Sequence, residues 1–236
     1  METLDDLQNG YYIYQRKDGF KFGIDAVLLA DFAKCRAKRA IDLCTGTGIV
    51  PILLAAKTKI PRIDAIEIQH DVAEMAAKSV EYNSLTDRIS IVEGDLKEAA
   101  KIFGKDRYDI VTVNPPYMKS GAGFVNDGTY KTISRHEVMC VLEDVIKSAS
   151  ELLNANGKLF MVHRPQRLAD IFCLMRKYKI EPKLIRFVSP RCGKEPNLVL
   201  LEGIKNGNAD LKFMPTLYVY DSDGNYTKEI DEIYGR

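Results

Sequence analysis

The sequence Asn114-Pro115-Pro116-Tyr117 combines residue types that can hold an amino group for reaction. Proline fixes φ at about −65° and carries no N–H donor, and the residue before a proline is held extended. The turn is therefore rigid, and the Asn114 side-chain oxygen and the Pro115 carbonyl oxygen can accept hydrogen bonds from one planar –NH2 group. Such bonds would draw the nitrogen lone pair out of conjugation, so that positioning becomes the catalysis. Tyr117 offers an aromatic face on which a flipped base can stack.

A second group of residues has the spacing of a nucleoside-binding site. In "IDLCTGTGIVP", Gly46 and Gly48 let the backbone approach a ligand closely, and the helix that follows can receive a carboxylate at its N-terminus. A dinucleotide fingerprint has a third glycine where Pro51 stands, which weakens that interpretation. Glu67 lies 21 positions after Gly46, where a carboxylate can accept hydrogen bonds from both ribose hydroxyls. Asp95 of "EGD" can accept from an adenine amino group, beside Leu96.

The elements that position these residues alternate between strands and helices. Five β-branched runs, "AIDLC", "IDAIEI", "RISIVE", "YDIVTV" and "KLFMVH", precede segments of helical spacing at 49–57, 72–82, 96–103, 137–153 and 166–178. This alternation predicts an α/β fold with a mostly parallel sheet and helices on both faces. The chemistry-bearing residues then stand at carboxyl ends of strands, where ligands bind in such sheets. Before the first strand, 11–22 has a hairpin pattern around Lys17-Asp18-Gly19, and 23–33 has helical spacing.

The last two apolar runs, near Leu184 and Leu198, are separated only by the short segment 189–196 and must pair antiparallel. A parallel sheet with this ending resembles the class I methyltransferases, which use S-adenosylmethionine. The resemblance implies a doubly wound seven-stranded sheet of order 3-2-1-4-5-7-6, with strand 7 antiparallel. The predicted cofactor-binding residues are Phe22, Gly23, Asp25, Asp42, Gly46, Gly48, Glu67, Asp95, Leu96 and Asn114.

Four motifs taken together, "DLCTGTG", "IEI", "EGD" and "NPPY", resemble the amino-group methyltransferases. The flanking segments "GFKFGIDAVLLADFA", "LVLLEGIKNG" and "LYVYDSDGNYTKEIDEIY" resemble the bacterial tRNA(Val) adenine-N6-methyltransferases, which modify the adenosine just 3′ of the anticodon. The resemblance implies a tRNA substrate and catalytic roles for Asn114, Pro115 and Tyr117, which hold the target amine. It also implies that Phe22 and Asp25 help to close over the cofactor, together with Gly23.

Other functions remain open at this point. A protein glutamine N5-methyltransferase handles the same planar –NH2 group, but fewer than 40 residues precede the first predicted strand, whereas such enzymes carry a sizeable helical domain there. A DNA adenine-N6 methyltransferase would call for a target-recognition domain, which the sequence does not indicate. A binding module that has lost turnover fits poorly with the intact Asn114 and Tyr117. We expect His136 to lie in the first turn of a helix capped by Ser134 and Glu137, and 118–133 to act as a lid.

Charge is unevenly distributed although the formal net charge is only +1. The sequence from Arg176 to Lys194 contains seven basic residues and one acidic residue. The 34–39 segment, "KCRAKR", contains four more basic residues. A phosphate-facing surface is the functional interpretation. The predicted RNA contacts are Lys119, Arg164, Lys183, Arg186 and Arg191. For His163 a structural role is favoured, with contact to phosphate or ribose as the alternative.

Composition restricts the remaining possibilities. The longest apolar run, 49–56, is too short to span a bilayer, and the acidic N-terminus is unlike a targeting peptide, so we expect a cytoplasmic protein without a membrane partner. Five scattered cysteines without C-x-x-C predict reduced packing residues and no metal site. We expect three parts, an N-terminal hairpin and helix at 1–38, a methyltransferase domain at 39–205 and a strand or hairpin extension of the same domain at 206–236, and favour a monomer.

Overall fold

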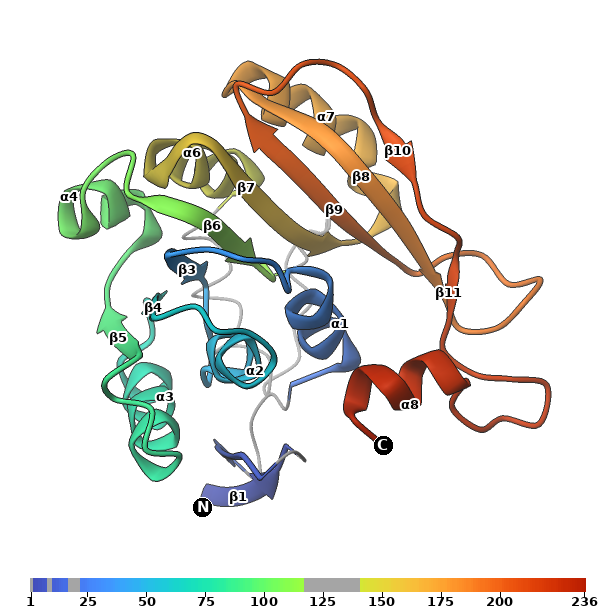
Figure 1. Ribbon diagram of the computed structural model, residues 1–236, viewed down its shortest axis with the longest axis horizontal. Coiled ribbons are helices and arrows are strands. Elements are labelled where there is room, and N and C mark those ends of the chain that lie inside the picture. The colour runs from blue at the N-terminus through green and yellow to red at the C-terminus, as the bar shows by residue number, and fades with distance from the viewer. Residues whose placement is uncertain (1, 8–9, 17–21, 117–140) are drawn as a thin grey trace, which may run out of the picture.

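The structure is a computed structural model that describes residues 2–7, 10–16, 22–116 and 141–236. Its centre is a 9-stranded sheet covered by helices on both faces (Figure 1). The strands of this sheet are β3 (Arg39–Leu43), β4 (Arg62–Glu67), β5 (Ile89–Glu93), β6 (Tyr108–Val113), β7 (Leu153–His163), β8 (Ile180–Ser189), β9 (Leu198–Lys205), β10 (Lys212–Phe213) and β11 (Leu217–Tyr218).

The order of the long strands is β5-β4-β3-β6-β7-β9-β8, which confirms the predicted order 3-2-1-4-5-7-6. Strand β9 runs antiparallel to both β7 and β8, as the short connection between β8 and β9 predicts. The two-residue strands β10 and β11 both pair parallel with β8. They add to the sheet beside β8, beyond the seven predicted strands.

The helices divide between the two faces because the strands are apolar on both sides. Phe160 and Val162 of β7 belong to a core shared with helices α1 and α2, whereas Met161 between them belongs to the core beneath α6 and α7. Figure 1 shows α1 and α2 on the face opposite α6. The helices are α1 (Ile24–Phe32), α2 (Ile49–Lys57), α3 (His70–Tyr82), α4 (Ala99–Phe103), α6 (Leu142–Leu152), α7 (Leu168–Lys177) and α8 (Lys228–Tyr234).

Two predicted boundaries differ from the structure. The strand β2 (Tyr12–Arg16) pairs with β1 (Glu2–Asp6), so its hairpin partner precedes it, and the predicted turn at 17–19 lies outside the described residues. Helix α6 begins at Leu142 because Val141 is extended, with ψ of 159°, and its N–H donates to the Asp144 carboxylate. The predicted helix start near Glu137, with Ser134 and His136, lies outside the described residues, as does 118–133.

The C-terminal segment contributes helix α8, which the sequence did not lead us to predict. Ile230 and Ile233 of α8 are buried in the same core as α1 and α2. The expectation that the cysteines are packing residues is wrong for Cys173 and Cys192, which are exposed. The division at residues 38 and 205 remains a prediction.

Candidate functional site

The register of the parallel strands brings the predicted site residues to one edge of the sheet. Leu43, the last residue of β3, pairs with Ile66 of β4 and with Val113 of β6. Glu67 pairs with Glu93 at the end of β5. The carboxyl ends of these strands therefore lie together, next to the point where strand order reverses. This edge carries the glycine turn after β3, Glu67 of β4, Asn114 and Asp95.

The glycine turn is shaped by backbone conformations that favour glycine. Gly46 has φ of 57° and Gly48 has φ of 87° before helix α2 begins at Ile49. A Cβ added at Gly48 would lie 3.3 Å from the Ala76 Cβ of α3, so this glycine permits close packing of helix α3. A Cβ added at Gly46 would meet nothing within 4 Å, so the turn presents bare backbone to open space at Gly46.

Glu67 ties the glycine turn to the end of β4. Its Oε2 accepts the Gly46 N–H at 3.0 Å, and its Oε1 accepts the Gln69 N–H at 3.0 Å and the Gln69 side-chain amide at 3.3 Å. The residue is 5% exposed, so these bonds compensate for burial of the carboxylate. Three of its roughly four lone-pair sites are occupied, and acceptance of a second hydroxyl would require the Gln69 amide to move away.

Asp42 lies one residue before the end of β3 and is 1% exposed. Burial raises its pKa to about 7, a shift that the hydroxyls of Thr112 and Thr45 oppose and the charge of Glu67 reinforces. Thr112 donates to Asp42 Oδ1 at 2.6 Å, whereas the nearby Thr45 Oγ1 is buried without a well-formed hydrogen bond among the described residues.

Asp42→Asn is expected to remove a pH dependence of stability. Because the pKa of Asp42 is raised on folding, the folded state binds more protons than the unfolded state between about pH 4 and pH 7, and this contribution to stability is lost as pH rises through that window. Asparagine has no such titration, keeps an acceptor for Thr112, and can donate to Thr45 Oγ1. The urea midpoint of Asp42→Asn should therefore exceed that of the wild type at pH 8, and the difference should shrink toward pH 5. If the urea midpoints of the wild type and of Asp42→Asn changed in parallel with pH, a raised pKa of Asp42 would be contradicted.

Four other predicted cofactor residues have local roles in the structure. Asp95 caps a short 3-10 helix by accepting the Lys97 N–H at 2.9 Å, and Leu96 is buried behind it. At the start of α1, the Asp25 carboxylate accepts the Ala26 N–H at 2.9 Å and folds over Gly23, where an added Cβ would lie 2.7 Å from Asp25 Oδ1. A side chain at position 23 would therefore displace the Asp25 carboxylate.

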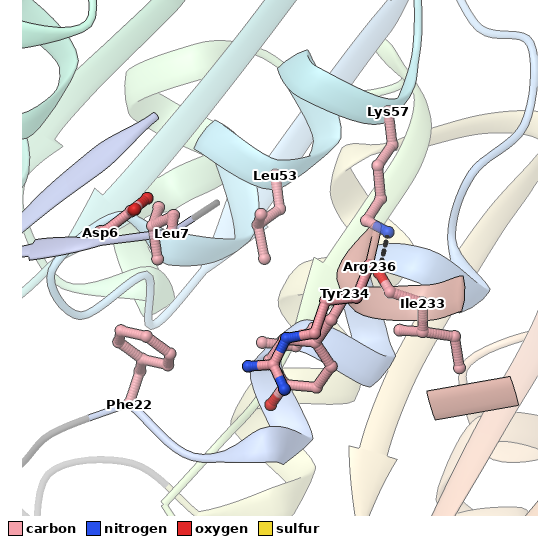
Figure 2. A pocket seen from close by; sticks show the side chains of 9 residues that line it. Asp6, Leu7, Phe22, Leu53, Lys57, Ile233, Tyr234 and Arg236 are labelled. Carbon is pink, nitrogen blue, oxygen red and sulfur yellow. Dashed lines mark hydrogen bonds between the residues drawn. The ribbon is translucent and has the colours of Figure 1, made fainter. Parts of the chain in front are cut away.

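Phe22 lines a small pocket at the junction of three segments, the hairpin, helix α2 and the C-terminus. Figure 2 shows Phe22 with Leu53 of α2 and with Tyr234 and Arg236. The pocket has a volume of about 120 Å³, far below the 300–1,000 Å³ that is usual for a ligand site, so this pocket does not accommodate a whole nucleoside cofactor. The Phe22 N–H donates to Gln15 Oε1 at 2.9 Å, which attaches this residue to the hairpin.

The residues after β6 are described up to Pro116. Asn114 is half-buried, Pro115 is buried and Pro116 is exposed, so the start of the turn is packed into the sheet edge. Tyr117 and Lys119 lie outside the described residues. Asn114 follows β6 directly, beside the end of β3 on one side and β7 on the other.

The predicted RNA contacts divide into exposed and structural residues. Arg191 is exposed at the carboxyl end of β8, and Arg164 donates to the Asn197 carbonyl at 2.9 Å. Lys183 donates to the Asn208 carbonyl at 3.0 Å. The prediction for Arg186 is wrong, because its side chain is 11% exposed and bonds the Pro215 carbonyl and the carboxylate of Glu229.

Arg186→Ala is expected to lower the free energy of unfolding by about 2 kcal/mol, the scale for losing buried hydrogen bonds to a charged group. The loss should be accompanied by loosening of α8, since Glu229 of α8 loses its partner. Arg176→Ala is the control, because Arg176 pairs with Glu181 on the surface, where such pairs contribute little. Urea unfolding of both variants measures the difference; equal midpoints would contradict a structural role for Arg186.

Sequence reasoning missed some residues. Gln69 is a local partner of Glu67, two positions along the chain, whereas Thr112 lies 70 positions after Asp42, and only the strand register, in which these two residues pair, identifies it. His163, for which contact with phosphate or ribose was only the alternative to a structural role, is 3% exposed, and burial lowers its pKa to about 4. Its Nδ1 accepts the Arg164 N–H at 2.8 Å, so it is neutral and does not present a charge to phosphate. His70, by contrast, opens helix α3.

Within the described ranges, no helix is long and apolar enough to cross a membrane. The same part of the chain contains no group of three or more histidine, cysteine or acidic side chains that is arranged to hold a metal ion.

Comparison with known proteins identifies relatives over most of the chain. Residues 24–178 match the methyltransferase small domain family. A tRNA1(Val) (adenine(37)-N6)-methyltransferase of Porphyromonas gingivalis is 30% identical over 218 residues, which cover 89% of this chain and 85% of the relative. The enzyme of the same name from Aeromonas hydrophila is 25% identical, with 92% and 89% covered.

Solved structures support the same fold. A predicted O-methyltransferase, Atu636 from Agrobacterium tumefaciens, superimposes with a TM-score of 0.72 at 27% identity, over 89% of this chain and 95% of that chain. Methanocaldococcus jannaschii Trm5 in complex with adenosine has a TM-score of 0.59 at 17% identity, over 88% of this chain and 56% of that chain, and shows the fold alone.

Proposed function

The chain belongs to the methyltransferase small domain family, and we propose that it transfers a methyl group from S-adenosylmethionine to the exocyclic N6 of an adenine in tRNA. The observation that carries the proposal is the meeting of the glycine turn, Glu67 and Asn114-Pro115 at one sheet edge. The relatives named as tRNA1(Val) (adenine(37)-N6)-methyltransferases support a tRNA of valine type and the adenosine 3′ of its anticodon as the target. A tRNA substrate favours action in the cytoplasm.

The residues at the edge fit the proposed cofactor. Open space in front of Gly46 leaves room for a ligand against bare backbone, and the N-terminus of α2 lies directly behind it. The remaining lone pair of Glu67 can accept a ribose hydroxyl, and movement of the Gln69 side chain frees a second. Asp95 and Leu96 follow the neighbouring strand β5, where an adenine ring would lie. S-adenosylmethionine, when bound, supplies an electrophilic methyl group.

Asn114 and Pro115 would prepare the nucleophile. Their side-chain and main-chain oxygens accept the two hydrogens of the target –NH2 group, which orients the nitrogen and turns its lone pair toward the methyl group. With S-adenosylmethionine bound, the methyl group would pass from the cofactor sulfur to this nitrogen, which would then lose one proton to solvent. No strong base is required at this step. We propose that Tyr117 stacks on the flipped base.

Incubation of the protein with labelled S-adenosylmethionine and unmodified tRNA tests the proposal, followed by analysis of the labelled nucleosides. We expect label in N6-methyladenosine at one position of one tRNA. Release factor and duplex DNA provide the competing substrates, because a glutamine amide and a DNA adenine present the same –NH2 group. Label that enters only one of these would overturn the proposal.

A further inference from the structure

The loop between β8 and β9 lies at the same sheet edge as the proposed site. Strands β8 and β7 are parallel, since both are antiparallel to β9, so the end of β8 at Ser189 lies at the edge where β7 ends at His163. We call residues 190–197 the docking loop. It is linked to the end of β7 through Arg164, which donates to the Asn197 carbonyl at 2.9 Å.

The docking loop is held in one shape by a buried hydroxyl. Ser189 is 1% exposed and donates to the Lys194 carbonyl at 2.6 Å, while the Lys194 N–H returns to the Arg191 carbonyl at 3.1 Å. Gly193 adopts φ of 76° to close this turn. The side chains of Arg191 and Lys194 are exposed, and neither forms an ion pair within the described part of the chain. A preformed loop thus presents two cations at this edge.

An aromatic column stands against the docking loop. The rings of Tyr220 and Tyr226 stack with centroids 5.3 Å apart, and those of Tyr226 and Tyr234 stack at 5.8 Å; we call these residues the tyrosine stack. The Tyr220 N–H donates to the Pro190 carbonyl at 2.9 Å, which joins the column to the loop. Tyr220 ends the stack and is 37% exposed.

We propose that the docking loop and Tyr220 form a platform for the RNA substrate, in which Arg191 and Lys194 contact phosphates and Tyr220 stacks against an unpaired base. This inference rests on the proposed function. Unpaired cations beside an exposed aromatic ring match the chemistry of single-stranded RNA, which offers phosphates and base faces together. The platform is bordered by the acidic residues Glu195, Asp221 and Asp223. Because carboxylates repel phosphates, the platform contacts only a few phosphates.

The opposite edge of the sheet provides a matched control. Arg36 and Lys38 are exposed before β3, at the amino ends of the strands, and line a groove of about 660 Å³. The strand β6 between the two edges has six residues, a length of about 20 Å. Arg36→Ala/Lys38→Ala therefore removes the same two charges as Arg191→Ala/Lys194→Ala, but far from the proposed site.

The test measures the Kd of both double variants and the wild type for unmodified tRNA as salt is varied. We expect Arg191→Ala/Lys194→Ala to raise Kd about 10-fold and to reduce the slope of log Kd against log salt by about 1.4, because each phosphate contact to a single strand contributes about 0.7. The control should change neither value. The affinity for S-adenosylmethionine should be unchanged in both variants.

Variants of Tyr220 test the stacking contact separately. Tyr220→Ala should raise Kd about 10-fold with an unchanged salt slope, and Tyr220→Phe should bind as the wild type does. An unchanged urea midpoint for Tyr220→Ala excludes collapse of the stack.

The outcomes separate the platform from the proposed function. If the wild type binds and methylates tRNA while Arg191→Ala/Lys194→Ala behaves as the control does, the platform is wrong and the function stands. A wild type that neither binds nor methylates tRNA overturns both.

Discussion

Asn114→Ala is expected to lower the single-turnover rate of methyl transfer by about 100-fold or more with cofactor and tRNA saturating. The variant loses one of the two acceptors that would orient the target amine, and deletion of one preorganised polar contact in a transition state has effects of this size. The affinity for S-adenosylmethionine should stay within a few-fold, because Glu67 belongs to β4, and Gly46 and Asp95 follow β3 and β5. Rapid-quench measurement of labelled nucleoside gives the rate.

The conservative variant distinguishes an acceptor from a stiff turn. Asn114→Asp keeps one side-chain oxygen in the same place and should retain more activity than Asn114→Ala, because the acceptor remains. Pro115 is unchanged in both variants, so the rigidity of the turn is constant. If Asn114→Ala reacted at the wild-type rate, this segment would be only a structural turn at the end of β6.

Glu67→Ala is expected to weaken binding of S-adenosylmethionine by about 2 to 4 kcal/mol, which corresponds to about 30- to 800-fold in Kd. The expected loss has two physical sources, since Glu67 would accept ribose hydroxyls and also accepts the Gly46 N–H at 3.0 Å. Calorimetry with the cofactor measures the total. Glu93→Ala is the matched control, because Glu93 pairs with Glu67 across the strands but is exposed and contacts His70 instead.

An analogue without ribose hydroxyls separates the two sources. If Glu67 acts by accepting these hydroxyls, Glu67→Ala should bind a 2′,3′-dideoxy analogue of the cofactor nearly as well as the wild type does. If Glu67→Ala lost equal affinity for S-adenosylmethionine and for the dideoxy analogue, Glu67 would act through the glycine turn alone. Gln69→Ala should keep or raise the affinity for the natural cofactor, since it frees a lone pair on Oε1.

The sequence predicted the sheet well because its signals are local. The order of the long strands is the one that the resemblance to the class I methyltransferases implied. Helix α2 spans Ile49–Lys57 as the glycine turn and apolar spacing indicate, and β9 is antiparallel to β8 as the short connection between them predicts. These features depend on backbone conformation, side-chain period and connection length, which are written in neighbouring residues. The parallel register then brings the ends of β3, β4, β5 and β6 to one edge, so the location of the candidate site followed from the same signals.

The roles of the charged residues were decided only by tertiary structure. Arg186 and Arg191 belong to one basic run in the sequence, yet the first is buried against Glu229, 43 positions away, and the second is exposed. The basic run from Arg176 to Lys194 includes the whole of β8, so its first and last residues lie at opposite ends of this strand. Likewise, Glu67 accepts the backbone N–H of Gly46, 21 positions away in the turn after β3, and the docking loop is joined to Tyr220, 30 positions after Pro190. Charge and residue type are local properties, whereas burial and pairing depend on which distant segments the fold brings into contact.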